Sequence, residues 1–575
     1  MPKTYVLADL KAAKTREDLA KILGIEVKKL TYLLYVLPAN QRYTSFEIPK
    51  KLGGTRVIDA PREDLKKIQR ELANLLQRCI NEITDSENGR MSVASYGFVP
   101  GGGITRNAKL HRARRWVFNI DLHNFFGSIS FARIFGFLQK HDGFLLQKSV
   151  ATTIAQLACH DSRLPQGAPT SPIFSNLIAS ILDFHLLRLA QRMGCTYSRY
   201  ADDLTFSTNL REFPSAIARQ SESGIWELGR ELRGILKKCD FELNPSKTRM
   251  QYQQSRQDVT GLVVNRRVNV RYEYRREVRA MANSLFTTGK FFVNEVDNEQ
   301  NIYGKEVESA KSLDRLHGML GFVHGVDEFH AQATQGVPSK ESSSLALYIR
   351  FLLFRFLFAN PYPLIICEGK TDNIYLSRAI HALHASFPEL LRVNEKNQKR
   401  VLSVRFFKFS DGAAIGKLLG IHSGGGANIA SLLRKYAKAC EGFVASVKQQ
   451  PVIFLMDNDS GSNAIKSDVR KITENQISGD EDFVHIFGNA YLILTPKIAK
   501  KDSSEMEDFF DENAKSQVID GKVFNPAKDA DPTQHYGKAI FAHKVVVGMA
   551  DKVNFDGFHP LLDRVRQVIA YQKAL

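Results

Sequence analysis

Two adjacent carboxylates, Asp202 and Asp203, stand between two short runs of apolar, β-branched and aromatic residues. Residues 196–199 and 204–207 therefore predict a β-hairpin with both acids at its tip. A third acid, Asp121, ends another short apolar run at 117–120. Three carboxylates at the ends of neighbouring strands can hold two divalent cations roughly 3.5–4 Å apart, which is the arrangement that drives in-line phosphoryl transfer. Because Mg²⁺ accepts carboxylate oxygens and binds substrate phosphates, these residues predict a Mg²⁺-dependent phosphoryl-transfer site.

A turn rich in proline and glycine, Leu164-Pro165-Gln166-Gly167, lies between the two acidic runs, and residues 171–186 after it predict a helix. With Asp121 and the Tyr200-Ala201-Asp202-Asp203 box, this turn resembles the palm of reverse transcriptases, which use dNTP substrates. The resemblance implies that Asp121, Asp202 and Asp203 are catalytic Mg²⁺ ligands. It also implies nucleotide-binding roles for Arg56, for Phe126 as a steric gate against a ribose 2′-OH, for Gln166 and for Lys247. A surface cation remains an alternative for Arg56 and Lys247.

Two further boxes resemble those of retron reverse transcriptases. Asn107-Ala108-Lys109-Leu110-His111 resembles their Asn-Ala-x-x-His box, and Val259-Thr260-Gly261 resembles their Val-Thr-Gly box. The resemblance covers about residues 15–330. It implies a partner non-coding RNA (msr-msd) that is copied into branched single-stranded DNA (msDNA), starting from the 2′-OH of an internal guanosine. It further implies RNA contacts by Asn107 and His111, although packing of His111 in the core is an equal alternative.

The formal net charge of +18 and the pI near 9.4 predict a polyanionic partner such as nucleic acid. The densest cationic stretch runs from residue 266 to residue 279, with Tyr272 and Tyr274 interleaved. Arginines at this spacing suit phosphates, and tyrosines stack on unpaired bases. A solvated charged face is the simpler alternative. The predicted RNA contacts in this stretch are Arg266, Arg267, Arg271, Arg275 and Arg276.

A chain of 575 residues is too long for one core. We expect N-terminal helices, fingers and palm over 1–255, a mainly helical thumb over 256–331, a polar linker at 332–344 and a second domain over 345–575. The apolar run 345–359 is too short to span a bilayer. The scattered cysteines and the lack of an apolar leader favour a cytoplasmic protein without a membrane partner. A homo-oligomer is possible.

A second set of acids follows strand-like runs in the C-terminal half. Glu368 ends the run 364–367, and Asp457 and Asp459 follow the run 452–456. In a parallel sheet these ends share one edge, so the three acids can meet at a metal site. The motifs resemble the Toprim domain of topoisomerases, primases and OLD-type nucleases, in which such residues bind Mg²⁺. The resemblance also points to Glu507 and Asp508 near a second metal position and to an intervening loop at 423–426. A phosphate contact is conceivable for Lys538, but a surface lysine is the simpler reading.

The fold class expected is therefore an α/β multidomain chain, with a right-hand polymerase of fingers, palm and thumb followed by a Rossmann-like Toprim parallel sheet. The expected function is a retron RNA-directed DNA polymerase fused to a metal-dependent Toprim nuclease that acts as a toxic effector against phage. Two alternatives stay open. The C-terminal domain can be a non-catalytic scaffold for the RNA–DNA product, or the polymerase can be of the group II intron type. Glu368 and Asp457 lie 89 residues apart, which leads us to expect an insertion in the sheet.

Overall fold

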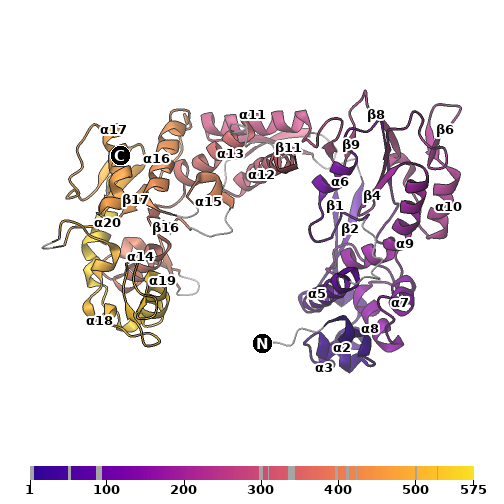
Figure 1. The fold of residues 1–575 in the computed structure, drawn as a ribbon, viewed down its shortest axis with the longest axis horizontal. Helices are drawn as coiled ribbons and strands as arrows, with labels where there is room; N and C mark the ends of the chain where they lie inside the picture. Colours follow the sequence, from indigo (N-terminus) through magenta and orange to yellow (C-terminus); the bar gives the residue numbers. More distant parts are fainter. Residues whose placement is uncertain are drawn as a thin grey trace. The chain divides into compact units, whose positions relative to one another are not determined.

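The computed structural model describes residues 6–49, 54–85, 94–296, 302–307, 310–333, 343–394, 399–408, 414–421, 424–498, 501–527 and 529–575. These residues fall into two compact units, which are taken separately below. The first comprises residues up to 275 together with 325–336, and the second comprises 276–324 together with 337–575. Figure 1 shows the course of the chain through both units.

The first unit begins with short helices, in line with the N-terminal helices expected from the sequence. These are α1 (Leu7–Ala12), α2 (Arg16–Ile22), α3 (Val27–Thr31), the π-helical η1 (Tyr32–Val36) and α4 (Ala39–Arg42). Thr15 caps α2, because its side chain accepts a hydrogen bond from Asp18 N. The two-stranded ribbon of β1 (Tyr43–Pro49) and β2 (Thr55–Pro61) follows, and then the long helix α5 (Glu63–Asp85).

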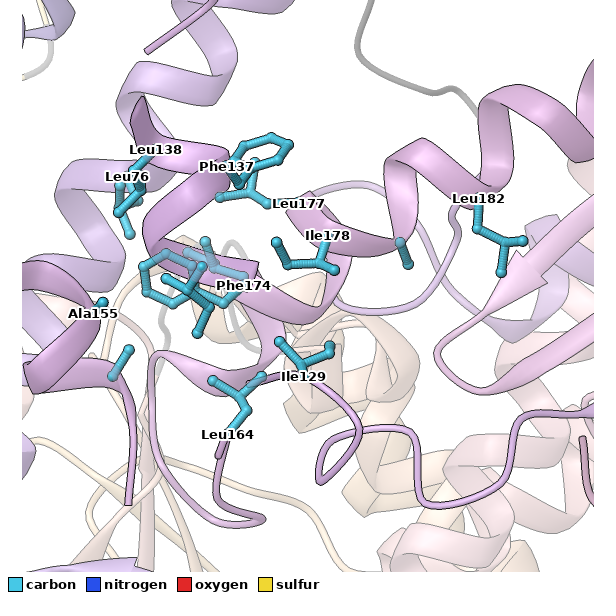
Figure 2. Close-up of a cluster of buried hydrophobic side chains, with 14 of the residues drawn as sticks. Leu76, Ile129, Phe137, Leu138, Ala155, Leu164, Phe174, Leu177, Ile178 and Leu182 are labelled. Atoms are coloured by element: carbon cyan, nitrogen blue, oxygen red, sulfur yellow. The ribbon is translucent and has the colours of Figure 1, made fainter. Parts of the chain in front are cut away.

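The centre of this unit is an antiparallel sheet in the order β4-β5-β3-β8. Its strands are β3 (Trp116–Asp121), β4 (Thr196–Tyr200), β5 (Asp203–Thr208) and β8 (Arg249–Tyr252). Helices α7 (Phe131–Lys140), α8 (Lys148–Ala158) and α9 (Ser171–Arg192) build the core beside it. Figure 2 shows the apolar face of α9, where Phe174, Leu177, Ile178 and Leu182 recur at helical spacing and meet side chains of α5, α7 and α8.

Helix α9 is also the one helix among the described residues that is long and apolar enough to cross a membrane by length and composition. The apolar run 345–359, which the sequence suggests is too short to span a bilayer, is not long and apolar enough by these criteria. More than half of the most apolar stretch of α9 is buried inside the protein (56%), as expected of a core helix.

Smaller elements complete the first unit. Helix α6 (Ile104–Leu110) precedes β3, and the hairpin of β9 (Asp258–Val259) and β10 (Leu262–Val263) follows β8. The remaining elements are β6 (Ala218–Gln220), β7 (Trp226–Leu228), α10 (Arg230–Lys238) and η2 (Pro245–Lys247).

The second unit contains most of the segment that the sequence assigns to a thumb. Its first elements are most of α11 (Tyr272–Thr288), β11 (Phe291–Val296), β12 (Ile302–Val307), most of α12 (Ala310–Ala333), α13 (Ser343–Leu353) and η3 (Phe354–Phe358). Phe286 of α11 packs against Phe354 and Phe443 at ring distances of 5.6 and 5.3 Å. Its carbonyl also accepts hydrogen bonds from Val444 N and Ala445 N. Residues 276–324 thus belong to the same compact unit as the C-terminal half, whereas the first residues of α11 and the last residues of α12 belong to the first unit. Most of the expected linker, at 334–342, lies outside the described residues.

The C-terminal half is built on a five-stranded sheet in the order β16-β13-β17-β19-β18. Strands β16 (Arg405–Phe406), β13 (Leu364–Cys367), β17 (Val452–Met456) and β19 (Ala490–Leu494) are parallel, and β18 (Val484–Phe487) is an antiparallel edge. The segment between Glu368 and Asp457 contains β16, a strand of the sheet itself, so the expected insertion is part of the fold. The sheet is flanked by α14 (Lys370–Ala382), α16 (Gly426–Cys440), α17 (Asn463–Thr473) and α20 (His559–Ala574).

Other elements of this half are η4 (Pro388–Leu390), β14 (Leu391–Val393), β15 (Arg400–Leu402), α15 (Ala414–Leu419), η5 (Ser460–Ser462), η6 (Met506–Phe509), α18 (Glu512–Lys515), β20 (Val523–Phe524), β21 (His535–Tyr536), α19 (Lys538–Ile540), η7 (Phe541–Val547), η8 (Ala550–Lys552) and η9 (Asp556–Phe558).

Candidate active sites

The three palm acids meet at one end of the antiparallel sheet. Asp203 lies directly opposite Asp121 in the pairing of β5 with β3, and β4 and β5 form the hairpin that the sequence predicts. Ala201 at the tip has φ +56°, and the backbone of Asp202 is held by a hydrogen bond from Leu122 N to Asp202 O (3.0 Å). A left-handed alanine is costly, so the tip depends on its surroundings to keep this geometry.

A buried ion pair anchors the tip from beneath. Arg199 and Asp183 are fully buried and 2.8 Å apart. Arg199 also donates to Ala201 O (3.0 Å) and to Asn176 Oδ1 (3.1 Å). The sequence reasoning missed this support, although an arginine inside an apolar strand next to the acidic box was a usable signal.

Gly97 packs closely against the same turn. A Cβ on Gly97 would lie 2.7 Å from Ala201 N and 3.3 Å from the carbonyl carbon of Tyr200. Asn176 Nδ2 donates to Gly97 O (2.9 Å), which fixes the glycine against the hairpin. Only a residue without a side chain fits here, and the sequence reasoning missed this position too.

The carboxylates at the tip lie close together, and the pKa values of two of them are raised. Burial and the neighbouring Asp202 and Asp121 carboxylates raise the pKa of Asp203 to about 6. Burial and Asp121 also raise the pKa of Asp202, against the lowering effects of Lys247 and Arg56. Lys247 Nζ lies 3.1 and 3.0 Å from the two carboxylate oxygens of Asp121. Lys247 is therefore a member of the site and not a remote surface cation.

No three His, Cys, Asp or Glu side chains within the described ranges are arranged as ready ligands of a single metal ion. The palm acids nevertheless suit Mg²⁺ chemically, because all three offer hard carboxylate oxygens and repel one another without a cation. Asp121, Asp202 and Asp203 would hold the ions, which would activate the attacking hydroxyl and stabilise the leaving group.

The residues expected to bind the nucleotide surround these acids. Gln166 O accepts from Asp59 N (2.8 Å), which joins the turn to the β1–β2 ribbon. Gly167 has φ +125°, and a Cβ there would meet Asp59 O at 2.9 Å. Phe126 is half-buried and packs against Phe125. Arg56 is exposed on β2 but close enough to Asp202 to lower its pKa. Their contacts with a nucleotide remain predictions.

The Asn-Ala-x-x-His box supports the sheet from within. His111 is completely buried, and its ring nitrogens lie 2.7 Å from Ser207 Oγ and 2.7 Å from Ser198 Oγ. Ser198 Oγ donates to Asn107 Oδ1 (2.6 Å), so Nε2 of His111 must donate to Ser198 while Nδ1 accepts from Ser207. Burial lowers the pKa of His111 to about 3, with a smaller contribution from Arg114.

This geometry corrects the RNA-contact prediction for Asn107 and His111. Asn107 is 1% exposed, and both ring nitrogens of His111 are already engaged, so neither side chain reaches the surface. The core alternative for His111 is the one that the structure supports. The Val-Thr-Gly box packs against α6, the helix that carries Asn107, because Thr260 Oγ1 donates to Ile104 O (3.3 Å).

The arginine stretch divides into two groups. Arg271 is held 2.8 Å from Asp258, and Arg275 is held 2.5 Å from Asp327. These two side chains therefore stabilise the fold where the sequence predicts RNA contacts. Arg266, Arg267 and Arg276 are exposed and remain predicted RNA contacts.

The second acidic set gathers at the carboxyl edge of the parallel sheet. Glu368 follows β13 and Asp457 follows β17, two strands that lie side by side. The chain leaves β13 towards β16 on one side and returns to β17 on the other, so the gap between β13 and β17 is a topological switch point, where open α/β sheets bind ligands. Asp459, two residues on, caps η5 by accepting from Gly461 N (2.9 Å).

A glycine turn closes this edge. Gly425 N donates to Glu368 O (3.0 Å), and a Cβ on Gly424, at φ +70°, would meet the same oxygen at 2.5 Å. A Cβ on Gly426 would meet Gly461 O at 2.2 Å. The expected intervening loop therefore lies against both acidic ends, except that Ser423 is outside the described residues.

Glu507 and Lys538 complete the cluster. Lys538 Nζ lies 2.9 Å from Glu507 and 3.1 Å from Glu505, so it is not the plain surface lysine that the sequence favours. Burial and the carboxylates of Asp372 and Glu507 raise the pKa of Asp457 to about 8. Asp508 instead pairs with Lys501 (2.6 Å). The sequence reasoning missed Asp372, which the fold places beside Asp457.

Two buried carboxylate oxygens in this cluster, Glu368 Oε2 and Glu507 Oε1, have no hydrogen-bond partner. An unpaired buried carboxylate oxygen is costly, and a cation would relieve that cost. Glu368, Asp457, Asp459 and Glu507 offer the hard carboxylate oxygens that Mg²⁺ prefers, but among the described residues they are not arranged as ready ligands of one ion. Their role as Mg²⁺ ligands, which would serve to polarise a phosphodiester and activate water, remains a prediction.

Residues 48–264 match the family model described as reverse transcriptase (RNA-dependent DNA polymerase). This match covers less than half of the chain. The chain is 32% identical over 344 residues to the retron Mx162 reverse transcriptase of Myxococcus xanthus, which covers 55% of this chain and 65% of that protein. It is 36% identical over 293 residues to the retron Mx65 reverse transcriptase of the same organism, covering 47% of this chain and 62% of that protein. The chain thus spans slightly less than two thirds of the length of either relative.

The retron Ec86 reverse transcriptase of Escherichia coli is 29% identical over 313 residues, which is 54% of this chain and 84% of that protein. A telomerase structure from Candida albicans overlaps 55% of this chain and 64% of its own, at 10% identity and a TM-score of 0.31, which is too low to carry an argument. The N-terminal half of the chain is therefore similar to retron reverse transcriptases, and the region that matches the family model ends at residue 264, before the parallel sheet.

Proposed function

We propose that this protein is a retron RNA-directed DNA polymerase that copies a cognate non-coding RNA into branched single-stranded DNA. The observation that carries the proposal is the pairing of Asp121 directly opposite Asp203. Lys247 forms an ion pair with Asp121, and a hydrogen bond from Arg199 to Ala201 O holds the Tyr-Ala-Asp-Asp tip. A two-metal site needs carboxylates fixed in this way before substrate arrives. The similarity to retron enzymes supports the choice of template.

The test is Asp203→Asn in the protein purified with its co-expressed RNA. The substitution keeps the side-chain size and removes a charge that the metals need, so we expect DNA synthesis to vanish while RNA binding persists. Asp240→Asn, at an exposed position of the same unit, is the matched control. Normal amounts of branched DNA from Asp203→Asn would refute the polymerase assignment.

We further propose that the C-terminal sheet carries a Toprim-like, Mg²⁺-dependent phosphodiesterase that acts as a toxic effector against phage. Support comes from the acids at the switch point and from the two unpaired buried oxygens. Asp457→Asn should leave DNA synthesis intact and abolish toxicity and protection. Variants that stay fully toxic and protective would favour the scaffold alternative, in which this sheet only binds the RNA–DNA product.

A further inference from the structure

A cavity of about 500 Å³ opens in the first unit beside the start of the β1–β2 ribbon. Its lining consists of Ala39, Asn40, Tyr43, Ser45, His160 and Asp161. The volume is in the range of small-ligand sites, and most of the lining is polar. None of the roles assigned above uses these residues.

The position of the cavity excludes the incoming nucleotide as its occupant. Ser45 pairs with Asp59 across the ribbon, and Ser45 Oγ donates to that carboxylate (2.7 Å). Ile48 pairs with Arg56, three residues further along β1, so these two side chains lie on the opposite face. Arg56 is the residue near Asp202. The cavity therefore lies behind the ribbon, roughly 10 Å along β1 from the position opposite Arg56.

The lining chemistry suits a ribose and a base edge better than a phosphate. Asn40, Ser45 and Asp161 offer amide, hydroxyl and carboxylate groups, and no lysine or arginine is among the lining residues. A carboxylate accepts a hydrogen bond from a sugar hydroxyl and repels a phosphate. The 2′-OH is also the group by which a protein distinguishes RNA from DNA at a given position.

The turn that carries Asp161 is strained. Asp161 and the next residue, Ser162, have φ +46° and +60°, and the turn is closed by reciprocal backbone hydrogen bonds of 2.9 Å between His160 and Arg163. Left-handed residues other than glycine cost free energy and persist where the surroundings impose them, often at ligand sites. Here the conformation places the carboxylate at the cavity.

An exposed aromatic ring, that of Tyr35 on η1, precedes the lining residue Ala39 by four positions. Tyr35 is 52% exposed, yet Arg16 lies over its ring at 4.5 Å and its hydroxyl donates to Gln156 (2.9 Å). Gln156 lies on α8, four residues before His160. A ring that is held in place but open to solvent is a stacking platform for an unpaired base.

We propose that the cavity and Tyr35 bind the unpaired RNA template just before it is copied, with Asn40 and Asp161 reading the 2′-OH of one ribonucleotide. This inference rests on the proposed polymerase function and names a substrate contact of that activity. It assigns RNA selectivity to a site on the far side of the ribbon from the catalytic acids.

The test uses the full-length protein and primed RNA templates in which each of the first three nucleotides ahead of the templating base is, in turn, 2′-deoxy. For the parent protein we expect the deoxy substitution at one of these positions to raise the KM for template about tenfold. That factor corresponds to the free energy of one or two lost hydrogen bonds. Asp161→Gly with Asn40→Ala should raise the KM on the all-RNA template by a similar factor and be indifferent to the deoxy substitution. Glycine accepts the positive φ, so the turn is kept. Ser162→Gly relaxes the same turn without touching the cavity and should behave as the parent.

Three outcomes overturn the inference. The first is a parent that tolerates all three deoxy positions, and the second is a double variant that retains the parent's sensitivity. The third is a double variant with an unchanged KM on the all-RNA template. A parent that copies no primed RNA at all contradicts the proposed function instead, so the two failures are distinguishable. Tyr35→Leu should raise the KM equally on RNA and deoxy-substituted templates, because stacking does not read the sugar.

Discussion

The buried His111 makes the palm acid-sensitive in a way that a single substitution can isolate. The ring is neutral at pH 7.5 in both the folded and the unfolded chain, since the unfolded pKa is about 6.5 and the folded pKa is about 3. Below pH 6.5 the unfolded chain binds a proton that the folded chain refuses, so stability falls as the pH falls towards 3. At pH 5.0 the difference is roughly 1.5 pKa units, or about 2 kcal/mol of unfolding free energy.

The assay follows from the position of the tryptophans. The chain has two, Trp116 and Trp226, and their rings lie 5.9 Å apart beside the palm sheet. Tryptophan fluorescence during urea unfolding of the full-length protein therefore reports on the first unit. In His111→Gln the change in unfolding free energy between pH 7.5 and 5.0 should be smaller by about 2 kcal/mol than in the parent.

His123→Gln, at an exposed histidine of the same unit, should leave the parent's pH dependence unchanged. The acid titrations common to all three proteins cancel in this comparison. If His111→Gln and the parent lose the same free energy between the two pH values, His111 is not buried as a neutral ring. At pH 7.5 the folded variant should also bind RNA as tightly as the parent, because the ring does not reach the surface.

Two further predictions concern the palm and the arginine stretch. Gly97→Ala should reduce DNA synthesis at least tenfold in a primer-extension assay, because its Cβ would push on the catalytic tip, whereas Gly136→Ala has no atom within 4 Å of its Cβ and should be neutral; equal activities would show that the tip tolerates displacement. Replacing Arg266 and Arg267 by glutamine should lower the slope of log affinity for RNA against log salt by about 0.7–0.9 per lost phosphate contact. An unchanged slope in this double variant would make those arginines a solvated face. Arg271→Gln should instead lower stability, because it removes the shorter of the two arginine contacts of Asp258 and leaves only Arg256, at 3.3 Å.

Much of the catalytic geometry was readable from the sequence because it is local. The hairpin with Asp202 and Asp203 at its tip and the strand ending in Asp121 follow from alternation and turn residues, and the structure confirms both. The helix predicted from Ser171 to Leu186 is also confirmed and extends to Arg192. Short-range patterns of this kind specify the backbone without knowledge of distant partners.

What could not be read depends on contacts between distant segments. The role of His111 is set by serines 87 and 96 residues away, and that of Arg271 by a carboxylate whose nearness no local pattern encodes. The resemblance of its box to a known motif therefore predicts an RNA contact for His111, although its hydrogen-bond partners are buried side chains of the protein. Burial decides between these meanings, and burial is a property of the folded chain.

Contacts between distant segments also decide how part of the predicted thumb packs. The polar composition of 332–344 suggested a boundary, but Phe286 on α11 finds its apolar partners in Phe354 and Phe443, and Arg350 donates to Gly442 O (2.7 Å) within the same cluster. An aromatic cluster of this size contributes several kcal/mol through burial, which is comparable to the whole stability of a small domain. A fragment that begins at residue 345 would expose these rings, so the proposed effector site is best studied in the full-length chain through substitutions such as Asp457→Asn.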